Sequence, residues 1–153
     1  MALIQADQDR IESLVEVILS HYSVMEPPVP IEKILTNPPG GLDAVDIRDM
    51  SLVFGVGEHR YEYRLALARL LYRELCRTEY TGIDAAPDVE PLPYNSEAAR
   101  HFAMAVLMPL AWLHAAAPRR RATLHDLAET YQVPGYAMAA RLANLGYTIK
   151  GME

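Results

Sequence analysis

Apolar residues recur at helical spacing in the first part of the chain. In DRIESLVEVILSH, residues 9–21, they return every three or four positions, and the glutamates fall largely on other sides. This pattern predicts an amphipathic helix, which Asp7 or Asp9 could cap. The prolines of MEPPVP interrupt the chain because proline cannot continue a helix. A short helix, IEKIL, is expected after them and before NPPGG.

The next part of the chain has a pattern typical of strands. LDAVDIR (42–48) alternates imperfectly, and SLVFGVG (51–57) is rich in β-branched and aromatic residues. EHRYEYR (58–64) could extend the sheet, with His59, Tyr61 and Tyr63 on one side. We therefore expect a small antiparallel or mixed sheet of about three short strands.

Helical periodicity returns in the second half. Helices are expected over residues 63–80, 96–116, 123–132 and 135–146, with Asn95 or Ser96 capping the second of them. Helices packed with a small sheet predict an α+β fold with about five to six helices. One domain is expected over residues 1–153, because the proline-rich loop before Ser96 does not justify a boundary. Residues 122–147 have the outline of a helix-turn-helix.

Composition narrows the function classes. The chain has 153 residues and a net charge of -6, which argues against a large nucleic-acid-binding surface. A single cysteine, Cys76, rules out an intrachain disulfide and a cysteine-cluster metal site. No apolar run reaches the length of a membrane span, and MALIQADQDRIE lacks the order of a signal peptide. The expected location is the cytoplasm.

Two segments carry a family resemblance. FAMAVLMP, residues 102–109, resembles F-A-x-x-L-L-M-P of the ImmA/IrrE family of zinc metallopeptidase-like proteins. LAETYQVPGYAMAARLANLGY is similar to that family's L-A-x-x-F-x-V-S-x-x-A-x-x-x-R-L-x-x-L-G. The order of segments is similar along nearly the whole chain. The resemblance implies a metallopeptidase-like fold.

The zinc motif of that family is altered here. RLALARLLY aligns with R-F-T-L-A-H-E-L-G-H, but Arg69, Leu70 and Arg73 occupy the positions of the two histidines and the glutamate. Arginine has no lone pair to give a metal, and leucine cannot accept a proton. The family's third ligand is an acid on the next helix, where Glu97 is one position from the expected place. The resemblance therefore implies a degenerate member, a pseudoenzyme with no metal cofactor.

If no zinc is bound, other interactions should replace it in the cleft where active relatives hold the metal, here called the former metal cleft. Glu97 could form an ion pair with Arg69 or Arg73, with Glu74 and Glu79 as rival partners. The arginine row, which Arg77 continues, could instead bind an anion or be a solvated face.

Two alternatives remain open at the sequence level. One is a peptidase with a displaced metal site, built on Glu97 and His101 at i, i+4 with His59 as a third ligand. The other is a DNA-binding or structural helix-turn-helix module. For DNA, the outer face of its second helix offers only Tyr136, Arg141 and Asn144, with Arg119 to Arg121 as phosphate contacts.

The preferred interpretation is a catalytically inactive protein with a binding or regulatory role. Its partner would be a protein such as a repressor-type transcriptional regulator, because active relatives act on such proteins. Nucleic acid and membrane are not expected as partners, and the sequence does not set the oligomeric state.

Overall fold

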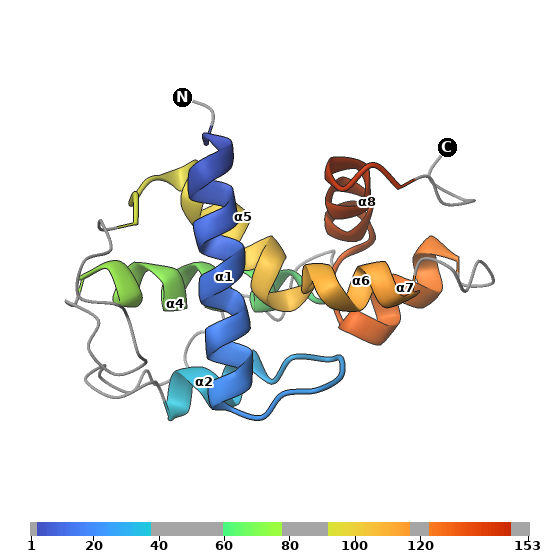
Figure 1. Cartoon of the computed structure of the whole chain (residues 1–153). Coiled ribbons are helices and arrows are strands. Elements are labelled where there is room, and N and C mark those ends of the chain that lie inside the picture. Colours follow the sequence, from blue (N-terminus) through green and yellow to red (C-terminus); the bar gives the residue numbers. More distant parts are fainter. Residues whose placement is uncertain (1–2, 38–59, 78–91, 117–122, 148–153) are drawn as a thin grey trace.

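The computed structural model describes residues 3–37, 60–77, 92–116 and 123–147, and these residues form helices (Figure 1). Their bounds are α1 Gln5–His21, α2 Ile31–Thr36, α4 Glu62–Arg77, α5 Ser96–Leu107, α6 Leu110–Ala116, α7 Leu124–Tyr131 and α8 Gly135–Asn144. Among the described helices, none has the length and apolar character needed to cross a membrane.

Helix α5 lies at the centre of the packing. It packs against α1 and α4, while α2 packs against α4, and α7 against α8. Its sequence explains this position, because small and large apolar residues cover most of its surface and Ala98, Phe102 and Val106 are fully buried. Phe102 meets Tyr72 of α4, with ring centroids 5.0 Å apart. The α4–α5 contact is therefore the core that supports any site on these two helices.

The α+β prediction is wrong. In the described part of the chain there are helices and no strand. The two expected strands, 42–48 and 51–57, lie outside the described residues. Of the expected extension, 58–64, the first two residues also lie outside the described residues, and residues 62–64 belong to α4, which begins at Glu62. Helical spacing explains this, because Arg64, Leu65 and Ala68 all lie on the buried side of α4.

The helix expected over residues 96–116 is in fact two helices. Met108 ends α5 with φ -132° and ψ 69°, and α6 begins at Leu110. Pro109 causes the break, because it has no amide hydrogen and disfavours helical backbone in the residue before it.

Capping was predicted with mixed success. The Oδ1 atom of Asn95 accepts a hydrogen bond from the Ala98 amide at 2.8 Å, as expected. Neither Asp7 nor Asp9 caps α1, whose first turn follows Ile4 without a side-chain cap. Asp7 instead pairs with Arg10 at 3.3 Å.

A capping box that the sequence analysis did not single out starts α7. The Thr123 Oγ1 atom accepts from the Asp126 amide, and the Asp126 carboxylate accepts from the Thr123 amide, both at 3.1 Å. At its other end, Gln132 ends α7 in the left-handed conformation with φ 54°.

Candidate functional site

Helix α4 has a buried face and an exposed face. Arg69, Arg73 and Arg77 are exposed and Leu70 is half-buried, whereas the other leucines of α4 and Ala68 pack into the core. The residues aligned with the zinc motif therefore stand on the outer side of α4. From there they can reach solvent, a ligand or a partner.

The expected ion pair with Glu97 does not form in the described part of the chain. Glu74, named above as a rival partner, forms ion pairs with both neighbouring arginines. Its Oε1 atom lies 3.3 Å from an Arg73 nitrogen and 3.4 Å from an Arg77 nitrogen. Glu97 is exposed on α5, and among the described residues no ion pair joins it to Arg69 or Arg73. The other rival, Glu79, lies outside the described residues. Glu74 thus offsets the repulsion between Arg73 and Arg77 within a single turn of α4.

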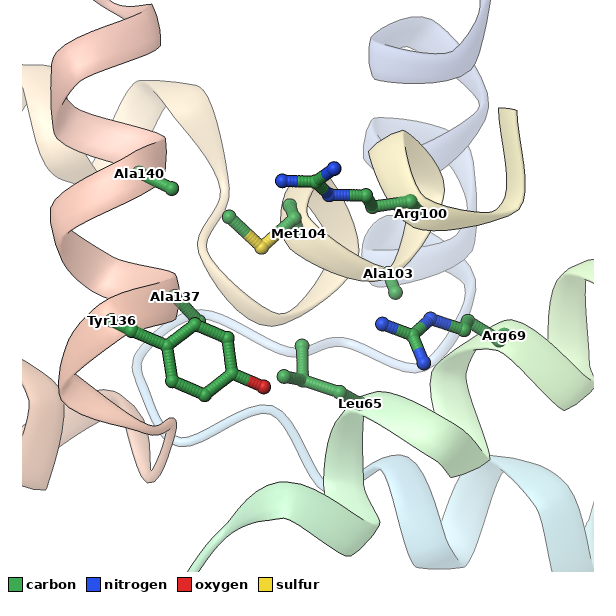
Figure 2. Close-up of a pocket in the computed structure, with 8 residues that line it drawn as sticks. All are labelled: Leu65, Arg69, Arg100, Ala103, Met104, Tyr136, Ala137 and Ala140. Atoms are coloured by element: carbon green, nitrogen blue, oxygen red, sulfur yellow. The ribbon is translucent and has the colours of Figure 1, made fainter. Parts of the chain in front are cut away.

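Arg69 behaves differently from the rest of the row. It lines a small pocket between α4, α5 and α8, with a cavity volume of about 30 Å³. The lining residues are Leu65, Arg69, Arg100, Ala103, Met104, Tyr136, Ala137 and Ala140 (Figure 2). Figure 2 shows the guanidinium groups of Arg69 and Arg100 extending toward the pocket, with the Tyr136 ring opposite on α8.

Sequence analysis missed Arg100, and it considered Tyr136 only for DNA contact. Arg100 lies three residues after Glu97 on α5, in the segment where the family resemblance places an acidic zinc ligand. A search for positive charge on that helix face would have found it. Tyr136 reaches the same pocket from α8, a placement that no local pattern indicates.

The electrostatics of the pocket involve one carboxylate. The Tyr136 hydroxyl lies 2.6 Å from both carboxylate oxygens of Glu62 and donates a hydrogen bond to this group. Burial, this bond and the charge of Glu62 together raise the pKa of Tyr136 to about 12, against the opposing charges of Arg69 and Arg100. The Glu62 carboxylate thus has the Tyr136 hydroxyl as a hydrogen-bond donor. In the described part of the chain, neither Arg69 nor Arg100 has a hydrogen bond or an ion pair of its own.

These residues do not fit the zinc ion of active metallopeptidases. The two guanidinium groups of Arg69 and Arg73 offer no lone pair, and Leu70 offers no base. Across the ranges that the structure describes, no three histidine, cysteine, aspartate or glutamate side chains are grouped so that they could hold a metal. We therefore derive no catalytic step through a metal.

His101 faces α1 and not the zinc-motif side of α4. Its Nε2 atom lies 3.3 Å from Glu12 Oε1, at ion-pair distance although not in hydrogen-bonding geometry. Glu97 and His101 therefore do not form the pair expected for a displaced metal site, because the acid beside the His101 imidazole is Glu12 and not Glu97. His59, the suggested third ligand, lies outside the described residues.

Arg141, a candidate for DNA contact, is buried inside the molecule. It is 2% exposed and donates to both Glu12 carboxylate oxygens, at 2.7 and 3.1 Å. Its Nε atom donates to the Met108 carbonyl, which the break before Pro109 leaves without a helical partner. Burial raises the pKa of Glu12, but His101 and Arg141 outweigh this effect and hold it below its ordinary value of 4.5. Arg141 therefore joins α8 to α1 and cannot reach a base.

The other candidate DNA contacts are also accounted for. Tyr136 is bonded to Glu62, and Asn144 is exposed at the end of α8. Arg119 to Arg121 lie outside the described residues. The described outer face of α8 thus presents little that could read DNA.

A second buried arginine explains why part of the motif is kept. Arg64, which aligns with the arginine of the family pattern, is 2% exposed. It donates to both oxygens of Glu32 at 3.0 and 3.1 Å, to the Val29 carbonyl at 2.6 Å and to the Gln132 carbonyl at 2.9 Å. Arg64 of α4 therefore links this helix to the segment before α2 and to the turn between α7 and α8. This role is structural and does not depend on a metal.

Comparison with known proteins gives one match. A family model described as the IrrE N-terminal-like domain of metallopeptidases matches residues 80–143. No curated protein and no solved structure matches significantly. The matched segment contains α5, α6, α7 and most of α8, and it begins after α4. The match at residues 80–143 supports the ImmA/IrrE-like family expected from the sequence, over 64 of the 153 residues.

Proposed function

We propose that this chain is a metallopeptidase-like domain without catalytic activity, and that it acts by binding. The observation that carries the proposal is the exposed side of α4, where Arg69, Leu70 and Arg73 stand at the positions of the zinc motif. Arg69 lines the pocket and Arg73 pairs with Glu74, and a guanidinium at either position cannot ligate zinc.

The chemistry of these positions supports the proposal. A zinc hydrolase needs two imidazoles at i and i+4 of one helix and a carboxylate that activates water. Guanidinium stays protonated at any physiological pH and would repel a cation. The surface that holds zinc in active relatives would therefore be positively charged in this chain, and it would favour an anionic partner.

The partner class follows from the family resemblance. Active relatives act on repressor-type transcriptional regulators, so we propose a protein of this class as the partner and the cytoplasm as the location. The buried Arg141 favours this reading over DNA binding by α8, because the side chain needed at a base is used inside the fold.

A cleavage assay tests the proposal. The wild-type chain is incubated with zinc and either casein or a purified repressor-type regulator, and the triple variant Arg69→His/Leu70→Glu/Arg73→His is run in parallel. We expect no cleavage by the wild type in either case. Cleavage by the wild type that 1,10-phenanthroline abolishes would overturn the proposal and favour a displaced metal site.

A further inference from the structure

We propose that the pocket between α4, α5 and α8 binds a single carboxylate group carried on a small apolar body, with Arg69 and Arg100 as its two cationic contacts. This inference rests on the proposed binding function and names the chemistry of its ligand. It concerns a site that the family match does not assign.

The two arginines reach the pocket from different helices. Arg69 stands on α4 and Arg100 on α5, and their guanidinium groups extend toward the same space (Figure 2). Within the described part of the chain neither one is hydrogen-bonded or ion-paired. Arg73 and Arg77, by contrast, share Glu74. Guanidinium groups bind carboxylates with paired, charge-assisted hydrogen bonds, so this pair of arginines has the chemistry for such an anion.

The local charge favours a monoanion. Arg69 and Arg100 bring two positive charges, and Glu62, held by the Tyr136 hydroxyl, brings one negative charge. A carboxylate would neutralise the remaining positive charge, whereas a doubly charged phosphate would leave an excess negative charge. Glu62 does not line the pocket itself but is hydrogen-bonded to the lining residue Tyr136, whereas among the described residues no hydrogen bond or ion pair joins Glu97 to a lining residue. Charge complementarity therefore points to a carboxylate.

The walls of the pocket suit a small apolar body. Leu65, Met104, the Tyr136 ring and three alanines form the rest of the lining, and the alanines leave space between α5 and α8. The space inside the pocket is about 30 Å³, which is room for a small group such as a carboxylate. The apolar body that carries the carboxylate would lie at the open mouth, against these walls. The carboxylate could belong to a peptide C-terminus or to an acidic side chain, since both present the same group.

The test uses the full chain in zinc-free buffer with a chelator, followed by two-dimensional NMR. The probes are N-acetyl-leucine, its uncharged analogue N-acetyl-leucinamide, N-acetyl-glutamate α-amide and inorganic phosphate. We expect at least one carboxylate probe to bind and to shift signals of Ala103, Met104 and Ala137, while the leucinamide does not. Binding of N-acetyl-leucine alone would identify a C-terminus, and binding of the glutamate amide would identify a side chain.

Matched variants locate the binding. Arg69→Gln and Arg100→Gln should each weaken carboxylate binding by about tenfold, because each removes one charge-assisted contact. Arg73→Gln, on the same helix but outside the pocket, should leave it unchanged. Ala140→Leu, at a half-buried lining position, should abolish it by filling the space. Circular dichroism confirms that each variant is folded.

Several results would overturn the inference. These are no carboxylate binding at about 20 mM probe, equal binding of the leucinamide, tighter binding of phosphate, or an equal loss in Arg73→Gln. Since no zinc is present, the result is independent of the cleavage assay. Carboxylate binding by a chain that also proves to be a peptidase would leave this site standing and overturn only the proposed function.

Discussion

Four arginines of this chain divide into two kinds according to the acceptors around them. Arg64 and Arg141 are each 2% exposed, and each has a carboxylate and at least one backbone carbonyl as partners. Arg69 and Arg100 line a pocket at the surface and have no such partner among the described residues. The buried pair stabilises the fold, and the pocket pair is available for a ligand.

Replacing Arg141 by leucine should destabilise the protein by about 3 kcal/mol, because a half-buried Glu12 charge loses its main partner. Urea unfolding followed by circular dichroism measures this. Arg73→Leu is the matched control, and its exposed pair with Glu74 should be worth less than about 1 kcal/mol. An equal effect of the two substitutions would contradict the assigned role of Arg141.

The pH dependence of this loss has a defined sign. Glu12 has a lowered pKa in the folded protein, so its contribution to wild-type stability is present above about pH 4.5 and is lost as the pH falls through that lowered value. In Arg141→Leu the Glu12 carboxylate keeps His101 beside it but loses Arg141, so its burial counts for more and favours protonation. The difference in unfolding free energy between wild type and variant should therefore shrink below about pH 4.5.

At this scale, the sequence was informative where interactions are local. Asn95 was a recognisable cap because its bond to Ala98 spans three residues. Arg141 was assigned to an outer face because its acceptor, Glu12, lies 129 residues away. Spacing on one helix cannot reveal a partner at that distance in the chain.

At the scale of elements, the sequence predicts that a helix is present more reliably than it predicts where the helix begins and ends. It predicts the fold class least well. The apolar spacing of α1, α2, α4, α7 and α8 indicated each of them correctly, because each buries one face. Pro109 was read as part of a longer helix, although it divides α5 from α6. EHRYEYR was read as a strand because its tyrosines alternate, whereas the burial of Arg64 and Leu65 follows helical spacing.

Removing the cap of α7 tests a feature that the sequence prediction does not include, although it does include the helix itself. Thr123→Ala should lower the unfolding free energy by about 1 kcal/mol, since the Asp126 amide loses its side-chain acceptor. Thr130→Ala is the matched control on the same helix. Its hydroxyl bonds a helical carbonyl, and alanine favours helix there, so little change is expected. Equal losses in both variants would argue against the cap.

At the scale of the whole molecule, family was predictable and the pocket was not. The apolar and proline pattern of FAMAVLMP fixes a packing helix and its end, and it lies inside the matched residues 80–143. The pocket is assembled from α4, α5 and α8, which are separate in sequence and meet only through tertiary packing. Sequence analysis therefore found Arg69 but not the neighbours that define its surroundings.

The central claim is that the arginine-substituted face of α4 does not hold zinc. Native mass spectrometry of the untagged chain, expressed with added zinc, tests this most directly. The triple variant Arg69→His/Leu70→Glu/Arg73→His serves as the comparison. We predict that the wild-type chain carries no bound zinc. A wild-type chain that retains one zinc ion, with metal loss after substitution of described histidine or acidic residues, would contradict the account.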